Sequence, residues 1–320
     1  MKEFKGLIKK QISNQYVVID LETKIEYKAL ASGKLRYVRV DEKSSFNVSY
    51  GRKTKREQQT LQISPKVGDI VDVIINNEQP FIDNIHPRKN DLYRPDVSNV
   101  DQVLLVFSAT RPEFSFNLLD KFLVILNEKD LKIILLVTKI DLVDNDELDD
   151  LKAKLKYYEE HVETDIYYVN SKQRVGFDYL ENIFENKITV LAGQTGVGKS
   201  TLLNNLIPEV EIKTQEISEA LGRGKHTTRH SELYDFNNGF ICDTPGFSRL
   251  DLNVYEKEDL KMYYPDFVEL SYDCRFNTCN HVQEPGCKVK EMVNDGLVPQ
   301  ERYNNYLLFY EEVTSKKNMF

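Results

Sequence analysis

The sequence contains no long apolar segment. Its longest apolar runs, such as IILLV at residues 133–137, fall far short of the roughly 20 residues needed to span a bilayer. The N-terminus, MKEFKGLIKK, is charged and no apolar stretch follows it, so we expect no signal peptide. These absences argue against a membrane protein and favour a cytoplasmic one.

Cysteine is also scarce, with four in 320 residues. Three of the four fall within the fourteen residues 274–287 near the C-terminus. In a cytosolic chain this clustering indicates a metal site rather than disulfides. We find neither internal repeats nor low-complexity tracts.

Positive charge is in deficit, because the formal net charge is −8, which alone argues against nucleic-acid binding. The deficit is uneven: residues 1–90 carry a net charge of +6 and the remaining residues carry −14. A basic N-terminal part on an acidic body is the asymmetry expected when one module meets a polyphosphate.

Residues 1–90 show short apolar or alternating runs, such as QYVVIDL and DIVDVII, separated by polar turns. They predict a small all-β barrel of about five strands. The polar and basic stretch at residues 41–59 predicts an exposed hairpin loop. Residues 86–99, HPRKNDLYRPDVSN, have two prolines and no periodicity, which predicts a linker.

From residue 91 to 258, buried strands such as LKIILLVTK alternate with amphipathic helices such as NDELDDLKAKLKYYEEH. This alternation predicts an α/β domain with a parallel sheet. Residues 259–320 are helical and aromatic in pattern and enclose the cysteine cluster. We therefore predict three domains, at residues 1–90, 91–258 and 259–320.

The segment GQTGVGKS, from Gly193 to Ser200, follows an apolar strand and opens a helix. Its glycines let several backbone N–H groups point at one phosphate chain, Lys199 adds a positive charge, and the Ser200 hydroxyl can ligate Mg²⁺. The strand–helix context disfavours the alternative of a chance glycine-rich turn. The predicted phosphate-loop contacts are Gly193, Gln194, Thr195, Gly196, Val197, Gly198, Lys199, Ser200 and Thr201.

A base-reading segment, TKID at residues 138–141, lies at the end of a buried strand, where α/β folds place ligand contacts. The Asp141 carboxylate can accept hydrogen bonds from guanine's N1–H and amino group, a pair that adenine lacks. Buried pairing of this type rejects the wrong partner by about 10⁴- to 10⁵-fold. The alternative is an ordinary charged strand end. The predicted base contacts are Thr138, Lys139, Ile140 and Asp141, with Ser171 and Lys172 as a second contact.

The segment DTPG, Asp243 to Gly246, follows the strand GFIC. Asp243 would hold the Mg²⁺ shell through water, and the Gly246 amide would contact the γ-phosphate. The upstream segment GKHTTRH offers Thr228, preferred over Thr227, as the Mg²⁺ and γ-phosphate ligand of a switch. These elements match the guanine-nucleotide motifs of the translation-factor-related GTPases, but in rotated order, because the base readers precede the phosphate loop. The chain thus resembles a circularly permuted GTPase.

Phe247 stands where many GTPases have a glutamine that orients the attacking water. Phenylalanine cannot orient water, so we predict slow intrinsic hydrolysis that depends on another group or a partner. His226 is the nearest polar candidate, with a solvated loop histidine as the alternative interpretation. The predicted catalytic residues are His226, Thr228 and Lys199.

The cysteine cluster has the spacing C-x4-C-x-H-x5-C, formed by Cys274, Cys279, His281 and Cys287. Three thiolates and an imidazole make a closed tetrahedral Zn²⁺ site, hence a structural one. Cys242, on a buried strand, is predicted to be a core residue.

Over nearly its whole length the chain resembles the bacterial ribosome small-subunit-dependent GTPases (RsgA, also called YjeQ or YloQ). Besides the motifs above, SGKLR, HPRKNDLYRP and LGRGKHTTRH are similar to segments of that family. The resemblance implies an N-terminal OB-fold that contacts ribosomal RNA, and a GTPase that acts late in 30S maturation and is stimulated by that subunit. Cofactors would be one structural Zn²⁺, and Mg²⁺ with GTP.

Two departures from the family pattern stand out. Thr138 occupies a position where asparagine is usual, which weakens one base contact, and the acidic body leaves contact with 16S rRNA mainly to the barrel. The basic segment of Arg52, Lys53, Lys55 and Arg56 is the candidate RNA contact, with a solvated loop as the alternative. We expect a monomer.

Two rival functions remain open at this point. One is a P-loop ATPase or kinase, which TKID and DTPG together oppose. The other is a GTP-gated RNA-binding scaffold in which hydrolysis is incidental, an interpretation with which Phe247 is compatible.

Overall fold

The computed structural model of the protein describes residues 2–36, 38–39, 60–61, 64–92, 96–208, 231–243, 252 and 256–317. The chain forms two compact units. Unit 1 comprises Met1–Gln102, Tyr179–Leu191 and Leu206–Phe247, and unit 2 comprises Val103–Asp178, Ala192–Asn205 and Ser248–Phe320. Every helix in the described part of the chain is too short or too polar to cross a membrane.

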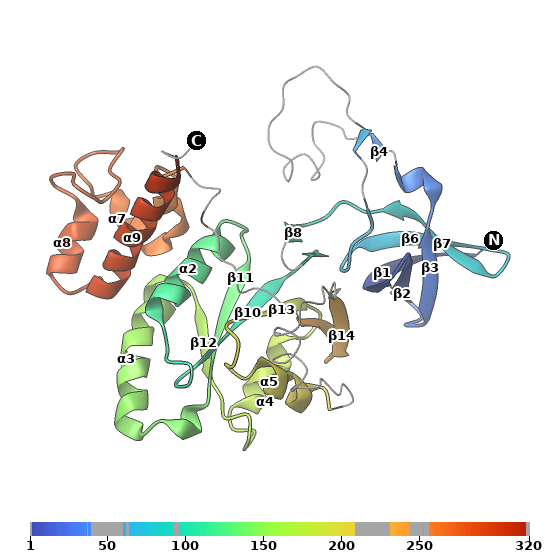
Figure 1. The fold of residues 1–320 in the computed structure, drawn as a ribbon, viewed down its shortest axis with the longest axis horizontal. Coiled ribbons are helices and arrows are strands. Elements are labelled where there is room, and N and C mark those ends of the chain that lie inside the picture. Colours follow the sequence, from blue (N-terminus) through green and yellow to red (C-terminus); the bar gives the residue numbers. More distant parts are fainter. Residues whose placement is uncertain are drawn as a thin grey trace. The chain divides into compact units, whose positions relative to one another are not determined.

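A five-stranded barrel forms the N-terminal part of unit 1 (Figure 1). The strand order is β1-β2-β3-β7-β6, and β6 pairs with β1 to close the barrel. The pairing of β3 with β7 is parallel and the others are antiparallel. The strands are β1 (Lys2–Ile12), β2 (Gln15–Asp20), β3 (Glu26–Ala31), β6 (Ile70–Asn76) and β7 (Gln79–Ile85). The predicted barrel of about five strands is confirmed.

The barrel interior is filled by apolar side chains of alternate strand positions. Ile8, Val18, Val71 and Ile82 are fully buried, as expected for strands that present every second residue to one face. A short 3-10 helix, η1 (Gly33–Arg36), leads to β4 (Val38–Arg39), which pairs antiparallel with β5 (Thr60–Leu61). The hairpin loop predicted at residues 41–59, with Arg52, Lys53, Lys55 and Arg56, lies outside the described residues.

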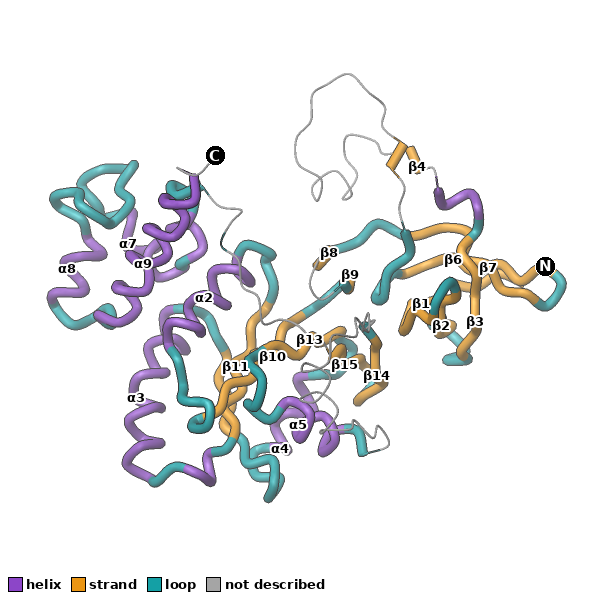
Figure 2. Tube along the Cα trace, viewed as in Figure 1, coloured by secondary structure: helices purple, strands orange, loops and turns teal. Residues whose placement is uncertain are grey.

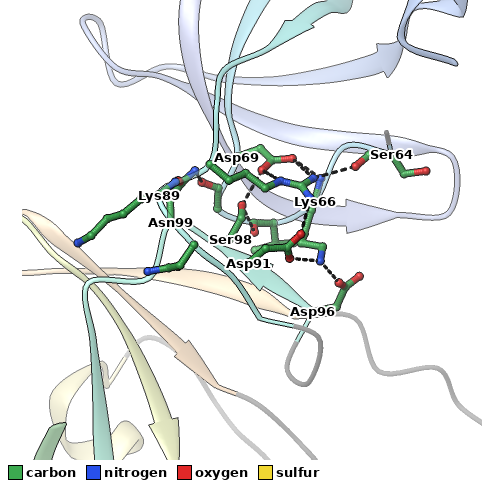
Figure 3. Close-up of polar contacts among 12 residues, drawn as sticks. Ser64, Lys66, Asp69, Lys89, Asp91, Asp96, Ser98 and Asn99 are labelled. Carbon is green, nitrogen blue, oxygen red and sulfur yellow. Dashed lines mark hydrogen bonds and ion pairs between the residues drawn. The ribbon is translucent and has the colours of Figure 1, made fainter. Parts of the chain in front are cut away.

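The segment predicted as a linker is bonded to the barrel (Figure 3). The Arg88 guanidinium donates to both carboxylate oxygens of the fully buried Asp69, at 2.7 and 2.9 Å. Ser98 donates to the same carboxylate at 2.6 Å, from β9 (Val97–Ser98), which pairs with β8 (Asp91–Leu92). A buried carboxylate needs such partners because an unpaired buried charge is costly. The network therefore holds the start of the next domain against the barrel.

Gly68 allows the backbone that precedes β6 to approach Ser98 of β9 closely. Its φ of +90° is in the left-handed region, and a Cβ there would lie 2.1 Å from the Ser98 carbonyl oxygen. No side chain fits in that space, so residue 68 has to be glycine.

Unit 1 also contains a second group of strands, β13 (Ile188–Ala192), β15 (Gly239–Asp243) and β14 (Glu232–Phe236). β13 and β15 are parallel, and β14 is antiparallel both to β15 and to barrel strand β1. Two ion pairs accompany the β1–β14 contact: Lys9 binds Asp235, and Lys10 binds Glu232 at 2.7 Å. The predicted strands of the α/β domain are found here, joined to the barrel.

Unit 2 begins with β10 (Gln102–Ser108), β11 (Lys132–Thr138) and β12 (Asp165–Tyr168), in the order β12-β11-β10. β11 and β12 are parallel. Helices α2 (Phe116–Asn127) and α3 (Asn145–His161) connect them (Figure 2). Ser115 caps α2, and Asp144 with Glu147 forms a capping box on α3, which satisfies free N–H groups of the first turn. β11 and α3 correspond to the predicted segments LKIILLVTK and NDELDDLKAKLKYYEEH.

The C-terminal part of unit 2 is helical, as expected. It comprises η3 (Leu260–Tyr263), α7 (Pro265–Ser271), α8 (Lys288–Asn294) and α9 (Gln300–Lys317). These elements enclose a core in which Tyr264, Phe267, Tyr306 and Phe309 are at most 1% exposed. Aromatic residues supply much of the buried area that such a short, loop-rich segment needs.

A buried ionic cluster fastens α9 to α2. Arg302, 1% exposed, donates to Asp266 through two nitrogens at 2.7 Å each, and also to Asp120. Asn305 donates to the second oxygen of Asp120 at 2.7 Å. Two carboxylates thus share one guanidinium, and burial raises the pKa of Asp120 to about 6 despite the attraction of Arg302.

We predict that Arg302→Leu destabilises the protein by about 3–5 kcal/mol, because it leaves two buried carboxylates without a cation. Asp120→Asn should cost clearly less, since the remaining Arg302–Asp266 pair is neutral. Urea unfolding of both variants measures this difference. Equal losses for the two variants would contradict the charge argument.

Candidate functional site: a nucleotide pocket and a metal centre

The phosphate loop curls where β13 ends and α5 (Lys199–Leu206) begins. Gly193, Gly196 and Gly198 have φ values of +131°, +85° and +100°, which side chains rarely adopt. A Cβ on Gly193 would lie 2.1 Å from the Val106 carbonyl oxygen. The Lys199 ammonium donates to the carbonyls of Gly193 and Gln194 at 2.7 and 2.6 Å. The loop therefore wraps around the Lys199 ammonium.

The end of β11 is joined directly to this loop. The Thr138 hydroxyl, 1% exposed, lies 2.5 Å from the Val197 carbonyl oxygen and 3.1 Å from that of Phe107. A hydroxyl has one proton, so it donates to one carbonyl at a time. Lys139 donates to Gly196 O at 2.7 Å and also to Arg111 O. The threonine that departs from the usual asparagine thus ties the base-reading strand to the phosphate loop.

A pocket of about 170 Å³ opens where these segments meet. Asp141 lines it together with residues of the phosphate-loop side, so the structure brings the two distant motifs to one cavity. The lining residues are Thr138, Lys139, Asp141, Leu142, Asn170, Ser171, Lys172, Gly198 and Thr201. Ile140, which begins the short helix η2 (Ile140–Leu142), is not among them. The roles of all these residues as nucleotide contacts stay predictions.

Two lysines, Lys139 and Lys172, and the Asp141 carboxylate line this pocket. Burial lowers the pKa of Lys139, and the nearby cations Arg111 and Lys172 lower it further. A bound anion lowers the electrostatic free energy of neighbouring cations, because it offsets their mutual repulsion. A bound anion would offset part of this repulsion around Lys139.

Asn170 is a pocket residue that the sequence analysis did not single out. It is 3% exposed, and its side-chain oxygen accepts hydrogen bonds from the backbone N–H groups of Lys172 and Gln173 at 3.0 and 3.2 Å. This side-chain turn fixes the segment expected to make the second base contact. The signal was present, since asparagine directly after a strand commonly makes such a turn.

Several predicted site residues lie outside the described part of the chain: Thr227, Thr228, His226, Gly246 and Phe247. The backbone of Asp243 is described, and it forms the last residue of strand β15. The roles assigned to Asp243 and to the residues outside the described part, as magnesium, γ-phosphate and catalytic residues, remain predictions.

The four predicted metal ligands form one cluster. The ligand atoms of Cys274, Cys279, His281 and Cys287 all lie within 4.8 Å of one another. Nδ1 of His281 lies 3.4 Å from the Cys287 sulfur and 3.7 Å from the Cys274 sulfur, so Nδ1 is the nitrogen that faces the thiols. Three of the four residues are buried, which fits a closed site that holds a metal ion.

Protein groups around the cluster hold its loop in place. Tyr303 and Tyr306 of α9 donate to the carbonyls of His281 and Asn280, at 2.7 Å each. The Glu284 carboxylate accepts three backbone N–H groups, those of Asn280, Val282 and Gln283.

The protonation preferences of the cluster also fit a metal. Burial, helped by the cation of Lys261, lowers the pKa of His281 to about 4, so its imidazole is neutral near pH 7 and can donate a lone pair. Burial and the neighbouring thiols raise the pKa of Cys287 to about 12. A bound cation would favour the thiolate forms, and the thiols would then lose their protons to water.

Comparison with known proteins decides the family. A model of the RsgA GTPase family matches residues 85–253, which is more than half of the chain. The chain belongs to the RsgA GTPase family. A relative named small ribosomal subunit biogenesis GTPase RsgA, from Onion yellows phytoplasma (strain OY-M), is 48% identical over 98% of both chains. One of the same name from Geobacillus sp. (strain WCH70) is 44% identical over 83% of this chain and 90% of its own.

Two RsgA-type crystal structures share the fold. YjeQ from Thermotoga maritima superposes with a TM-score of 0.79 at 32% identity and covers 98% of this chain and 99% of its own. YloQ, described as a circularly permuted GTPase, gives 0.76 at 35% identity and covers 98% and 96%. The predicted fold class is confirmed: a permuted α/β GTPase domain with an N-terminal barrel and a C-terminal module that carries a Cys3His cluster. The exact domain boundaries stay predictions.

We predict that the purified protein carries about one zinc ion per chain and that Cys279→Ser removes it. Loss of the ion should unfold the C-terminal core, because metal binding contributes about 10–16 kcal/mol of apparent folding free energy in small zinc modules. Elemental analysis and near-UV circular dichroism measure the two effects.

Cys242→Ser is the matched control, since Cys242 is buried on β15 and is not one of the four clustered ligands. It should keep the metal. Full zinc content in Cys279→Ser would refute the ligand assignment.

Proposed function

We propose that this protein is a GTP hydrolase that binds the small ribosomal subunit and assists late 30S maturation, with hydrolysis stimulated by the subunit. The observation that carries the proposal is that Asp141 lines the same pocket as Gly198 and Thr201 of the phosphate-loop segment. Its relatives' name, small ribosomal subunit biogenesis GTPase, supports the choice of subunit. Assembly on ribosomal subunits also implies a cytoplasmic protein.

In this proposal the guanine edge meets the Asp141 carboxylate, while Ser171 and Lys172 face the rest of the base. The loop from Gly193 to Thr201 surrounds the phosphates, and Lys199 supplies a charge within it. Mg²⁺ would be held by Ser200 and Thr228, with Asp243 reaching it through water, and would offset the charge on the phosphate oxygens. Gly246 would contact the γ-phosphate.

Hydrolysis itself would be slow without a partner. Phe247 offers no group that can position water, so His226 is the proposed replacement, placed correctly only on the subunit. A GTP-gated RNA-binding scaffold remains the second candidate, because Phe247 is also what a site with incidental hydrolysis would have. The pocket's guanine-type reader disfavours an ATPase or kinase.

The remaining modules would have binding or structural roles. The Cys3His cluster suits Zn²⁺, which would hold the C-terminal core together. The barrel, with Arg52, Lys53, Lys55 and Arg56 in its loop, would contact 16S rRNA by neutralising phosphates. We propose a monomer as the working unit.

We predict that Asp141→Asn lowers the affinity for GTP by about 100-fold or more, because an amide cannot accept both guanine donors. The affinity for xanthosine triphosphate, whose base presents an acceptor in place of the amino group, should rise. Competition against a fluorescent guanine nucleotide measures both. Asp146→Asn, which changes an exposed carboxylate on α3 outside the pocket, should alter neither. Unchanged GTP affinity in Asp141→Asn would remove Asp141 from the base site.

We predict slow GTP turnover by the protein alone and a stimulation of about 10³- to 10⁵-fold by purified small subunits. His226→Ala should lose the stimulation and retain nucleotide binding, whereas His161→Ala, at the end of α3, should behave as wild type. Multiple-turnover phosphate release measures this. Fast unaided turnover would contradict the role of His226, and no stimulation at all would favour the scaffold.

A further inference from the structure

One side chain outside every recognised motif joins the two walls of the pocket. Asn205, on α5, donates from its side-chain nitrogen to the Ser171 carbonyl at 3.0 Å and to the Thr201 carbonyl at 2.8 Å. Ser171 and Thr201 both line the pocket, and 34 residues separate Asn205 from Ser171. A primary amide has two N–H donors on one nitrogen, so one side chain satisfies both carbonyls.

A second bond fastens the same two elements. Arg174 donates from its guanidinium to the main-chain carbonyl of Asn205 at 2.7 Å, and the ring of Phe177 lies 5.1 Å from that guanidinium. The Ser171–Lys172 turn is already fixed internally by Asn170. Its position relative to α5 therefore depends on Asn205 and Arg174.

The turn that Asn205 holds contains an available donor. The Ser171 hydroxyl oxygen is buried and has no hydrogen-bond partner among the described residues. Guanine presents two donors, N1–H and the amino group, and one acceptor, O6, along the same edge. Asp141 suits the two donors, so O6 is left for donors of the Ser171–Lys172 turn.

We propose that Asn205 is a positioning residue for guanine recognition: it holds the Ser171–Lys172 turn at the distance from α5 at which that turn donates to O6. The inference rests on the proposed function. Of the two carbonyls that Asn205 holds, only that of Ser171 belongs to the turn that would meet the base. Asn205 should therefore control recognition of O6 and leave recognition of the amino group to Asp141.

The test uses three diphosphates: GDP, inosine diphosphate, which lacks the amino group, and 2-aminopurine riboside diphosphate, which keeps the amino group but lacks O6 and the N1–H donor. The lost N1–H bond to Asp141 lowers the affinity for the last compound equally in wild type and variant, so a change in the preference between them reports on O6. Competition against a fluorescent GDP derivative gives their affinities. Asn205→Asp has the same size but cannot donate. It should reduce the preference for GDP over the 2-aminopurine compound by about tenfold, the effect of one lost hydrogen bond. The preference for GDP over inosine diphosphate should stay unchanged.

Asn127→Asp is the matched control, because Asn127 makes the same kind of bond, from its amide to the Tyr263 carbonyl at 3.1 Å, away from the pocket. It should keep both preferences. If Asn205→Asp fails to fold, Asn205→Ala removes the same donors without adding charge and is judged by the same criterion.

A variant that retains both preferences, or loses both equally, would overturn the positioning role. If instead the wild-type protein shows no preference for guanine, the proposed function itself fails, and the two failures are thereby distinguished.

Discussion

The bond from the Thr138 hydroxyl to the Val197 carbonyl, across 59 residues of chain, is the contact around which the site is organised. A guanine-nucleotide site needs a base reader and a phosphate loop at fixed separation. Here Thr138, Lys139 and Gly196 supply that separation through hydrogen bonds between the end of β11 and the loop. These bonds do not depend on which segment comes first in the chain. This independence explains how a permuted order leaves the pocket intact.

Both ends of the permuted domain are held by buried charge. At its start, Arg88 and Ser98 share the carboxylate of Asp69, so the barrel is bonded to the first residues of the domain. At its end, Arg302 joins α9 to Asp120 of α2. Removing the guanidinium from such a cluster would leave buried carboxylates without a cation, which is strongly destabilising. Within unit 1 buried charge joins the barrel to residues 88–98, and within unit 2 it joins α9 to α2.

Much of the architecture could be predicted from the sequence. The apolar run LKIILLVTK and the helical pattern NDELDDLKAKLKYYEEH are local signals, so they identified β11 and α3. The motif spacing likewise brought Cys274 and His281 into one predicted cluster, because closely spaced cysteine and histidine ligands are typical of structural zinc sites. The phosphate loop from Gly193 to Lys199 could also be predicted, because the spacing of its glycines and lysine is typical of a strand–loop–helix turn that binds phosphate.

The contacts that fix one element against another could not be predicted. Asn205 looks like any polar residue at a helix end, and Arg302 like a solvated charge in an aromatic helix. Their importance comes from Ser171 and from Asp120, which only the fold brings near. The linker prediction at residues 86–99 missed the Asp69 network for the same reason: low periodicity does not reveal a long-range ionic bond.

A crystal structure of the protein with a non-hydrolysable GTP analogue and magnesium tests the central claim most directly. The account predicts the guanine edge within hydrogen-bond distance of the Asp141 carboxylate and the phosphates inside the loop from Gly193 to Ser200. A nucleotide whose base faces another cavity, or whose phosphates lie away from Lys199, would contradict it.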